Sequence, residues 1–225
     1  MAIADNIARI EEQIQTACAR AGRKREEISL VAVTKTVEPD IIRQAMDCGL
    51  TRLAENRVQE LTRKYDRLPG ANWHLIGHLQ SNKVKYIVDK VSLIHAVESV
   101  GLAREIDRQS EKCGKISDIL LEVNVSGEES KFGLSPETVQ ETLSQMAAFP
   151  HIRVRGLMTM APLLAGEKEI RHIFSTLYKI SVDNARNPYD NVSMEYLSMG
   201  MSNDFPLAIE EGATHIRVGR ALFQS

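Results

Sequence analysis

The sequence predicts an α/β protein folded as a single closed (β/α)8 barrel of the TIM type, with an extra helix at the N-terminus. Eight short apolar segments alternate with helical segments, a pattern that requires parallel strands joined by right-handed crossovers. The 225 residues lie near the lower end of the usual size of such barrels. An open doubly wound sheet is the alternative. Its glycine-rich turn after the first strand is replaced here by Lys35-Thr36-Val37-Glu38, which favours the barrel.

The first half of the chain opens with an amphipathic helix, in which isoleucines recur at helical spacing until Gly22 ends the pattern. No strand precedes this helix, so we expect it to plug one end of the barrel or to replace a helix missing after the eighth strand. Pro39 suits the first turn of the next helix and Gly49 its end, while Ser81 suits the N-cap of a later one. The expected order is strand 28–36, helix 39–48, strand 52–56, helix 58–68, strand 72–77, helix 81–88 and strand 91–97.

The second half repeats this alternation. Gly114 ends one helix, Ser135 and Pro136 form a strong helix start, and Pro150 closes that helix. The expected order is helix 100–112, strand 117–125, helix 135–150, strand 152–160, helix 167–185, strand 194–199, helix 203–210 and strand 214–219. No linker or low-complexity tract interrupts the chain, so we expect residues 1–225 to form one domain.

The composition argues against several classes of function. Hydrophobic residues at 43% and charged residues at 26% are typical of a globular protein. A formal net charge of −2 gives no reason to expect nucleic acid or an anionic membrane as a partner. The three cysteines lie far apart and predict neither disulfides nor a zinc site. With no apolar N-terminal region and no segment of membrane length, we expect a cytoplasmic protein.

Lys35 ends the apolar strand 28–36 and is the first candidate for chemistry. Side chains alternate along a strand, so Lys35 shares a face with Val31 and Val33, and its amine is expected to be partly removed from water. Desolvation lowers the pKa of an amine, and a neutral lysine can form a Schiff base with an aldehyde. The alternative is a solvated lysine that closes the strand.

Two glycine-containing segments follow the seventh and eighth strands, where barrels commonly bind phosphate. They are Ser198-Met199-Gly200-Met201-Ser202 and Arg217-Val218-Gly219-Arg220. Their backbone amides can approach an anion closely, assisted by the helix expected at 203, although a structural turn explains glycine and serine equally well. Closure of the barrel places both segments beside Lys35.

Arg217 alternates with two apolar residues on the eighth strand, so its side chain is expected to point into the mouth of the barrel. The alternative is a buried structural salt bridge with Glu55 or Glu98. His74 and His78 straddle a strand and its loop, a spacing that does not suit zinc, so no metal site is expected.

Six segments together resemble the pyridoxal 5′-phosphate homeostasis protein family, which is similar to the barrel domain of alanine racemase. The resemblance covers essentially the whole chain, and the segments at 73–83 and 198–202 are the most specific. It implies a fold type III barrel that binds pyridoxal 5′-phosphate (PLP). The segments are VAVTK (31–35), EN (55–56), WHLIGHLQSNK (73–83), GLMTM (156–160), SMGMS (198–202) and IRVG (216–219).

The same resemblance implies roles for individual residues. Lys35 would bear PLP as an aldimine, Asn56 would lie beside the cofactor, and Arg217 would face the pyridine nitrogen. Phosphate contacts would come from the ends of the seventh and eighth strands, at Met201, Ser202, Gly219 and Arg220. The resemblance also assigns Ser198 to the cofactor site. His78 stands where many members have proline. Arg220 stands where many have a small hydroxyl residue, which leaves its backbone amide and its guanidinium as phosphate donors.

The implied function is binding of PLP and homeostasis of PLP and of amino and keto acids, without catalysis. The alternatives are a PLP-dependent amino-acid racemase or related enzyme, and an interaction module that uses the cofactor as a signal. A racemase needs a second acid/base opposite the lysine, which the family's enzymes take as a tyrosine from an added domain of a partner subunit. No such domain is expected after the eighth strand. Expected partners are PLP, amino acids and PLP-requiring apo-enzymes, and the expected state is a monomer.

Overall fold

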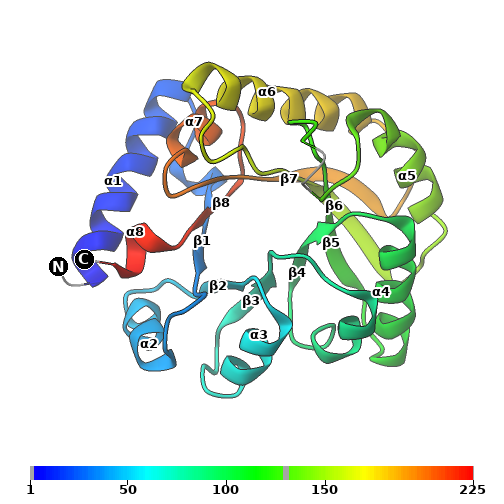
Figure 1. Cartoon of the computed structure of the whole chain (residues 1–225), viewed down its shortest axis with the longest axis horizontal. Coiled ribbons are helices and arrows are strands. Elements are labelled where there is room, and N and C mark those ends of the chain that lie inside the picture. Colours follow the sequence, from blue (N-terminus) through cyan, green and yellow to red (C-terminus); the bar gives the residue numbers. More distant parts are fainter. Residues whose placement is uncertain (1–2, 129–131, 225) are drawn as a thin grey trace.

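Eight parallel strands form a closed barrel in which each strand pairs with the next in the chain and β8 pairs with β1 (Figure 1). The computed structural model describes residues 3–128 and 132–224. This confirms the predicted barrel and excludes the open sheet. The strands are β1 (Ser29–Val33), β2 (Arg52–Glu55), β3 (Asn72–Leu75), β4 (Leu93–Val97), β5 (Ser117–Glu122), β6 (Ile152–Met158), β7 (Val192–Met201) and β8 (His215–Val218).

Helices surround the barrel in the predicted order (Figure 1). Their starts match the sequence signals well, and Ser99 caps α4 by accepting a hydrogen bond from the amide of Leu102 at 3.1 Å. The α-helices are α1 (Ile3–Ala21), α2 (Pro39–Asp47), α3 (Val58–Tyr65), α4 (Val100–Lys112), α5 (Val139–Met146), α6 (Glu167–Asn184), α7 (Phe205–Glu210) and α8 (Arg220–Phe223). Short 3-10 helices occur at η1 (Arg25–Glu27), η2 (Ser81–Tyr86) and η3 (Pro136–Thr138).

Two predicted helices differ from expectation. The α-helix expected over 81–88 is the 3-10 helix η2, whose N-cap position is Gln80 rather than Ser81, without a capping hydrogen bond from the side chain. The helix expected from 135 starts as η3, with Pro136 in its first turn, and becomes α-helical only at Val139. Short segments that must turn sharply between strands commonly adopt the tighter 3-10 winding. Neither change alters the order of the strands.

Helix α1 lies on the outside of the barrel and packs against α7 and α8 (Figure 1). Its buried Asn6 donates a hydrogen bond from Nδ2 to the backbone oxygen of Leu222 at 3.1 Å. Ile10 and Ile14 on the same helix are buried in the outer core. The plug is therefore wrong: α1 covers the outside of the barrel next to the short helix α8, which follows β8 where the sequence predicted no helix.

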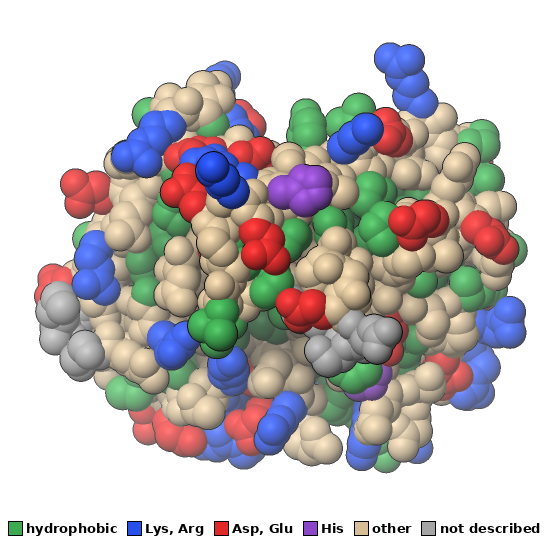
Figure 2. All heavy atoms as spheres, turned by 45° about the horizontal axis from the view of Figure 1, so that its top comes forward, with side chains coloured by type: hydrophobic (Ala, Val, Ile, Leu, Met, Phe, Trp, Pro, Cys, Tyr) green, Lys and Arg blue, Asp and Glu red, His purple; other side chains and the backbone are tan. Residues whose placement is uncertain are grey.

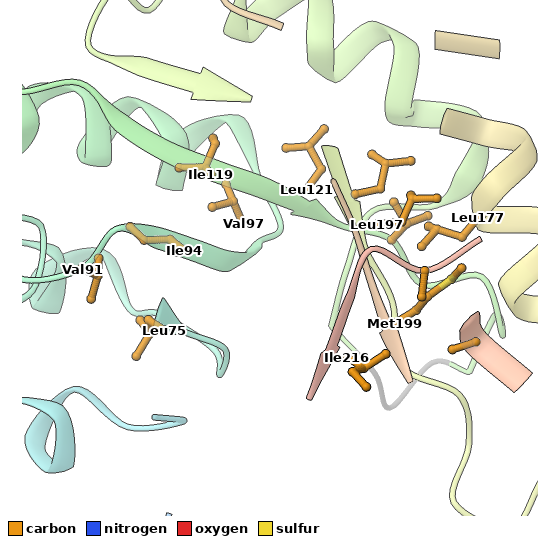
Figure 3. Close-up of a cluster of buried hydrophobic side chains, with 14 of the residues drawn as sticks. Leu75, Val91, Ile94, Val97, Ile119, Leu121, Leu177, Leu197, Met199 and Ile216 are labelled. Carbon is orange, nitrogen blue, oxygen red and sulfur yellow. The ribbon is translucent and has the colours of Figure 1, made fainter. Parts of the chain in front are cut away.

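The main hydrophobic core lies between the strands and the helices, not inside the barrel. Figure 3 shows part of it, in which Leu197 of β7 lies near Leu177 of α6, while Ile94 of β4 lies apart from them among other strand residues of the same core. A second, smaller cluster contains Leu93, Ala96, Leu120 and Met158, with Tyr196 packed against it. The strands therefore bury apolar side chains on their outer face and leave much of the inner face for polar residues.

The surface carries charges of both signs. Basic and acidic side chains are interspersed over the face shown in Figure 2. Among residues 3–128 and 132–224, no helix combines the length and the apolar character that crossing a membrane requires.

Candidate functional site

Lys35 lies in the turn after β1, and its side chain is exposed. Strand β1 ends at Val33, so the lysine lies two residues beyond the rim of the sheet. The expectation that its amine is partly removed from water is therefore wrong for this structure. Thr36, which follows it, has φ of +63°, the left-handed conformation that a β-branched residue rarely adopts. The turn that presents Lys35 thus holds a strained backbone.

A buried ion pair holds the ends of β1 and β2 next to this turn. Lys64 of α3 and Glu55 of β2 are both fully buried, and Lys64 Nζ lies 2.7 Å from Glu55 Oε1. Lys64 Nζ also donates to the backbone oxygen of Thr34 at 2.9 Å, and Thr34 Oγ1 donates to Glu55 Oε1 at 2.7 Å. Because Thr34 precedes Lys35 and Glu55 precedes Asn56, this pair anchors both candidate residues to α3.

Asn56 is half-buried at the end of β2. Gly77, after β3, passes so close to it that a Cβ at position 77 would lie 2.2 Å from the backbone oxygen of Asn56. Only glycine fits such an approach of two backbones. The glycine therefore sets the position of Asn56 at the rim, next to the strand that leads to Lys35.

A cavity of about 370 Å³ lies beside Lys35, between the turn after β1 and α8. Its volume is within the range of small-molecule sites. The backbone at Gly219 passes Val33 closely, since a Cβ on Gly219 would lie 3.2 Å from the oxygen of Val33. The structure thus brings Lys35, Gly219 and Arg220 together, as predicted from barrel closure. The cavity is lined by Val33, Lys35, Thr36, Val37, Glu38, Ile41, Gly219, Arg220, Phe223 and Gln224.

The candidate phosphate donors of β7 and β8 already hold partners within the protein. The amide of Met201 donates to Asp204 Oδ1 at 2.5 Å, and the amide of Gly219 donates to Ser202 Oγ at 3.4 Å. Asp204 is buried, and burial raises the pKa of its carboxyl. A phosphate would reach these amides only by replacing the protein oxygens. The longer bond at Gly219 is the weaker of the two.

Arg217 is 3% exposed and points into the barrel, which confirms its predicted orientation. Its Nη1 donates to Ser198 Oγ at 2.5 Å and its Nη2 donates to the backbone oxygen of Thr159 at 3.0 Å. The predicted alternative is wrong, because Glu55 pairs with Lys64 and Glu98 with His78. Burial lowers the pKa of Arg217 to about 10, which leaves the guanidinium charged at pH 7.

Ser198 belongs to a chain of hydrogen bonds inside the barrel. Its Oγ lies 2.8 Å from His95 Nδ1, and His95 Nε2 lies 2.9 Å from His74 Nδ1. Arginine can only donate, so Ser198 accepts from Arg217 and is free to donate to His95, which in turn can donate to His74. The Ser198 hydroxyl is fully buried within these hydrogen bonds. It contacts Arg217 and His95 inside the barrel and does not line the cavity beside Lys35.

The histidines inside the barrel are held neutral. Burial lowers the pKa of His74 to about 3 and that of His215 to about 4, and it places the pKa of His95 well below its usual value. His74 is thus part of the interior chain, whereas His78 lies on the loop after β3. The described residues contain no group of three or more His, Cys, Asp or Glu arranged to hold a metal ion.

Sequence reasoning missed Glu122 and Phe132, and with them the meeting of Glu122 and Glu98 and the stacking of Phe132 on His78, at the ends of β3, β4 and β5. Glu122 ends β5 and is 4% exposed, and burial, aided by the nearby Glu98, raises its pKa to about 7. Glu98 follows β4, and its Oε1 lies 3.1 Å from His78 Nδ1. The ring of Phe132 stacks on His78 with centroids 4.3 Å apart. Glu122 occupies an inward position two residues after Leu120, and that alternation is the signal in the sequence that could have revealed it.

The fold and the site define a class: a barrel of the alanine racemase type with a lysine after its first strand and glycine-containing segments at its last two. The family "Alanine racemase, N-terminal domain" matches residues 6–225. The "Pyridoxal phosphate homeostasis protein" of Aquifex aeolicus is 44% identical over 97% of this chain and 96% of its own, and that of Deinococcus radiodurans is 42% identical over 93% and 95%. The chain belongs to the pyridoxal phosphate homeostasis protein family.

Solved structures agree with this assignment. PipY of Synechococcus elongatus, solved with PLP bound, superposes with a TM-score of 0.84 at 32% identity, covering 98% of this chain and 99% of PipY. A protein of unknown function from Bifidobacterium adolescentis gives a TM-score of 0.89 at 36% identity, covering 98% and 94%. Alanine racemase of Clostridium difficile shares the fold, with a TM-score of 0.74 at 16% identity, and this chain covers 58% of it.

Proposed function

We propose that this protein binds PLP covalently through Lys35 and serves the homeostasis of PLP and of the amino and keto acids that depend on it. The observation that carries the proposal is the meeting of Lys35 with Gly219 and Arg220 around one cavity. PLP supplies an aldehyde that bonds to amines and a pyridine ring that accepts electron density. An exposed amine, an approachable backbone at Gly219 and a guanidinium suit an aldehyde that carries a phosphate.

The residues present favour binding of the cofactor over catalysis with it. Arg217 is fixed by two hydrogen bonds and remains charged, so toward a ring nitrogen it can act only as a donor. A ring nitrogen that accepts from an arginine stays unprotonated, which weakens the withdrawal of electrons on which amino-acid chemistry depends. We therefore propose that the protein turns over no amino acid at a useful rate. Among the remaining site residues, we assign Asn56 to the ring side of the cofactor and Met201, Ser202, Gly219 and Arg220 to its phosphate.

We further propose that amino acids and PLP-requiring apo-enzymes are partners, that the protein acts as a monomer, and that it works in the cytoplasm. The three free cysteines support a reducing compartment, because two of them, Cys48 and Cys113, are exposed.

The covalent bond is tested by absorption spectroscopy and peptide mapping. Protein loaded with PLP should show a visible band that borohydride removes, and mapping of the reduced protein should find the adduct on Lys35. The Lys35→Ala variant should lack the band, whereas Lys179→Ala, which removes an exposed lysine of α6, should keep it. An adduct on any other lysine contradicts the proposal.

The absence of turnover is tested separately. Loaded protein is incubated with L-alanine and other amino acids in deuterated water, and exchange and chirality at Cα are followed by NMR and chiral chromatography. We expect neither to change. Exchange at tens of turnovers per minute or faster, on the order of the slow end of ordinary enzymes, and lost in Lys35→Ala, would establish the racemase alternative instead.

A further inference from the structure

Two carboxylates lie in the mouth of the barrel on the side opposite Lys35. In a closed barrel of eight strands, β5 lies across from β1, so Glu122 at the end of β5 faces the side that carries the lysine. Glu98 at the end of the neighbouring β4 lies close enough to raise the pKa of Glu122. We call Glu98 and Glu122 the acidic pair.

The acidic pair has acceptor oxygens without donors. Glu122 is 4% exposed, and no hydrogen bond to its side chain occurs among the described residues. Glu98 uses Oε1 for His78, while its Oε2 is buried without a hydrogen-bond partner. Arg217 attracts Glu122 electrostatically, but its own hydrogen bonds go to Ser198 and Thr159. A carboxylate so placed loses its hydration without gaining a partner.

Among the described residues, His78 makes the only ion pair with either carboxylate. The small apolar cluster includes Leu120, two residues before Glu122, and Met158, its neighbour in the β5–β6 register. The groups that face Glu122 are Glu98, His78 and Arg217. A ligand that satisfies both carboxylates must bring hydrogen-bond donors and positive charge, and a primary ammonium group supplies three donors on one cation.

We propose that the acidic pair binds the side-chain ammonium of a basic amino acid, so that amino acids of the lysine and ornithine type are the preferred amine ligands of this protein. The proposal rests on the proposed function, because the α-amino group is taken to meet PLP on the Lys35 side. A neutral amino acid of the same length leaves the carboxylates unpaired, whereas its α-amino and α-carboxylate groups are the same as those of the basic amino acid. The preference therefore follows from the terminal ammonium alone.

The test compares L-ornithine with L-norvaline, which has the same carbon chain without the terminal amino group. PLP-loaded protein is titrated with each at pH 8 and low ionic strength, and the dissociation constant is taken from the change in the visible band. Ornithine should bind on the order of tenfold more tightly, as expected for one charge-assisted pairing. The advantage should shrink at pH 6, where Glu122 is mostly protonated.

Two variants locate the effect. Glu122→Gln keeps the shape of the protonated side chain and should remove most of the preference, and Glu98→Gln should remove part of it. Glu141→Gln, on the exposed side of α5, should leave the preference unchanged. Equal affinity for the two ligands in the parent protein, or an undiminished preference in both glutamine variants, overturns the proposal.

A second readout does not need the cofactor. The pKa of Glu122 is followed by NMR of carbon-13-labelled protein without PLP, in the presence and absence of ornithine; binding of an ammonium should lower it, and norvaline should not. An unchanged pKa with both ligands counts against the acidic pair. Absence of any visible band in the loaded protein would instead contradict the proposed function, so the two failures are distinguishable.

Discussion

Single residues in this barrel differ in how firmly hydrogen bonds to their neighbours hold them in place. Arg217 is held by Ser198 and Thr159, and the hydroxyl of Ser198 is committed in turn to the histidine chain behind it. Lys35, by contrast, is exposed and lies in a turn next to the strained Thr36. A guanidinium fixed by hydrogen bonds and an exposed amine suit the proposed site, in which the ligand's ring is retained while its covalent bond is made and broken.

Phosphate binding should be separable from the covalent bond at the residue scale. Gly219→Asp places a carboxylate where the phosphate is proposed to lie, and loss of about two charge-assisted hydrogen bonds costs roughly 3–6 kcal/mol. Binding of PLP should therefore weaken strongly, while unphosphorylated pyridoxal should bind nearly as before, as measured by titration of the visible band.

The control for that experiment is Gly219→Ala. Its Cβ meets the same oxygen of Val33 at 3.2 Å but brings no charge, so it reports the effect of crowding alone. If Gly219→Asp weakened PLP and pyridoxal equally, the phosphate site would have to lie elsewhere.

At the scale of elements, the ends of β1 and β2 depend on α3. Lys64 reaches from α3 to Glu55 and to the backbone oxygen of Thr34, and all of these groups are buried. The pair is therefore a structural support for the turn of Lys35, placed on the helix side of the sheet and not in the mouth.

Lys64→Met should leave the Glu55 carboxylate buried and unpaired, and it should lower the free energy of unfolding by about 3–5 kcal/mol. Urea unfolding monitored by circular dichroism measures the change. The double variant Lys64→Met, Glu55→Gln should recover part of the loss, because the uncompensated charge is gone. A loss below about 1 kcal/mol in the single variant, the range of exposed ion pairs, would contradict the buried geometry.

Sequence patterns predicted the order of the elements and most of their starts, because Pro39 and the alternating strands act locally. The sequence left open whether the amine of Lys35 is desolvated or solvated, since its exposure depends on β1 ending at Val33. The pairing of Lys64 with Glu55 and the meeting of Glu98 with Glu122 join different elements, and nothing in the local sequence signals them. The site residues from β1 and β8 were predictable only because barrel closure is a rule of topology.

At the scale of the whole molecule, the polar interior should make stability depend on pH. The buried histidines stay neutral when folded, but they take up a proton when unfolded below about pH 6.5. Their contribution to stability is therefore present above the unfolded pKa and is lost as the pH falls. At pH 5 this costs about 2 kcal/mol for His74 and about 2 kcal/mol for His215. The buried His95 acts in the same direction.

Glu122 acts in the opposite direction. Its raised pKa keeps the proton in the folded state up to about pH 7, whereas the unfolded carboxyl loses it near pH 4.5. Lowering the pH from 7 to 5 therefore adds about 2 kcal/mol to the free energy of unfolding through Glu122, which offsets only part of the loss from the histidines, so the net change should be a loss of stability. Urea unfolding at pH 5, 6, 7 and 8 measures this.

Glu122→Gln removes the restoring contribution, so this variant should lose more stability than the parent between pH 7 and pH 5. Stability that is flat over this range in the parent protein would show that the histidines are not neutral and buried as a group.

The position of α1 has a consequence for how the protein is made. This helix is made before any strand of the barrel, yet the surfaces that cover its buried isoleucines belong to α7 and α8, which flank the last strand. The barrel seam between β8 and β1 likewise joins the two ends of the sequence. An apolar helix face therefore stays uncovered until β8 and the helices beside it have been made, and the nascent chain must be kept from aggregating up to that point.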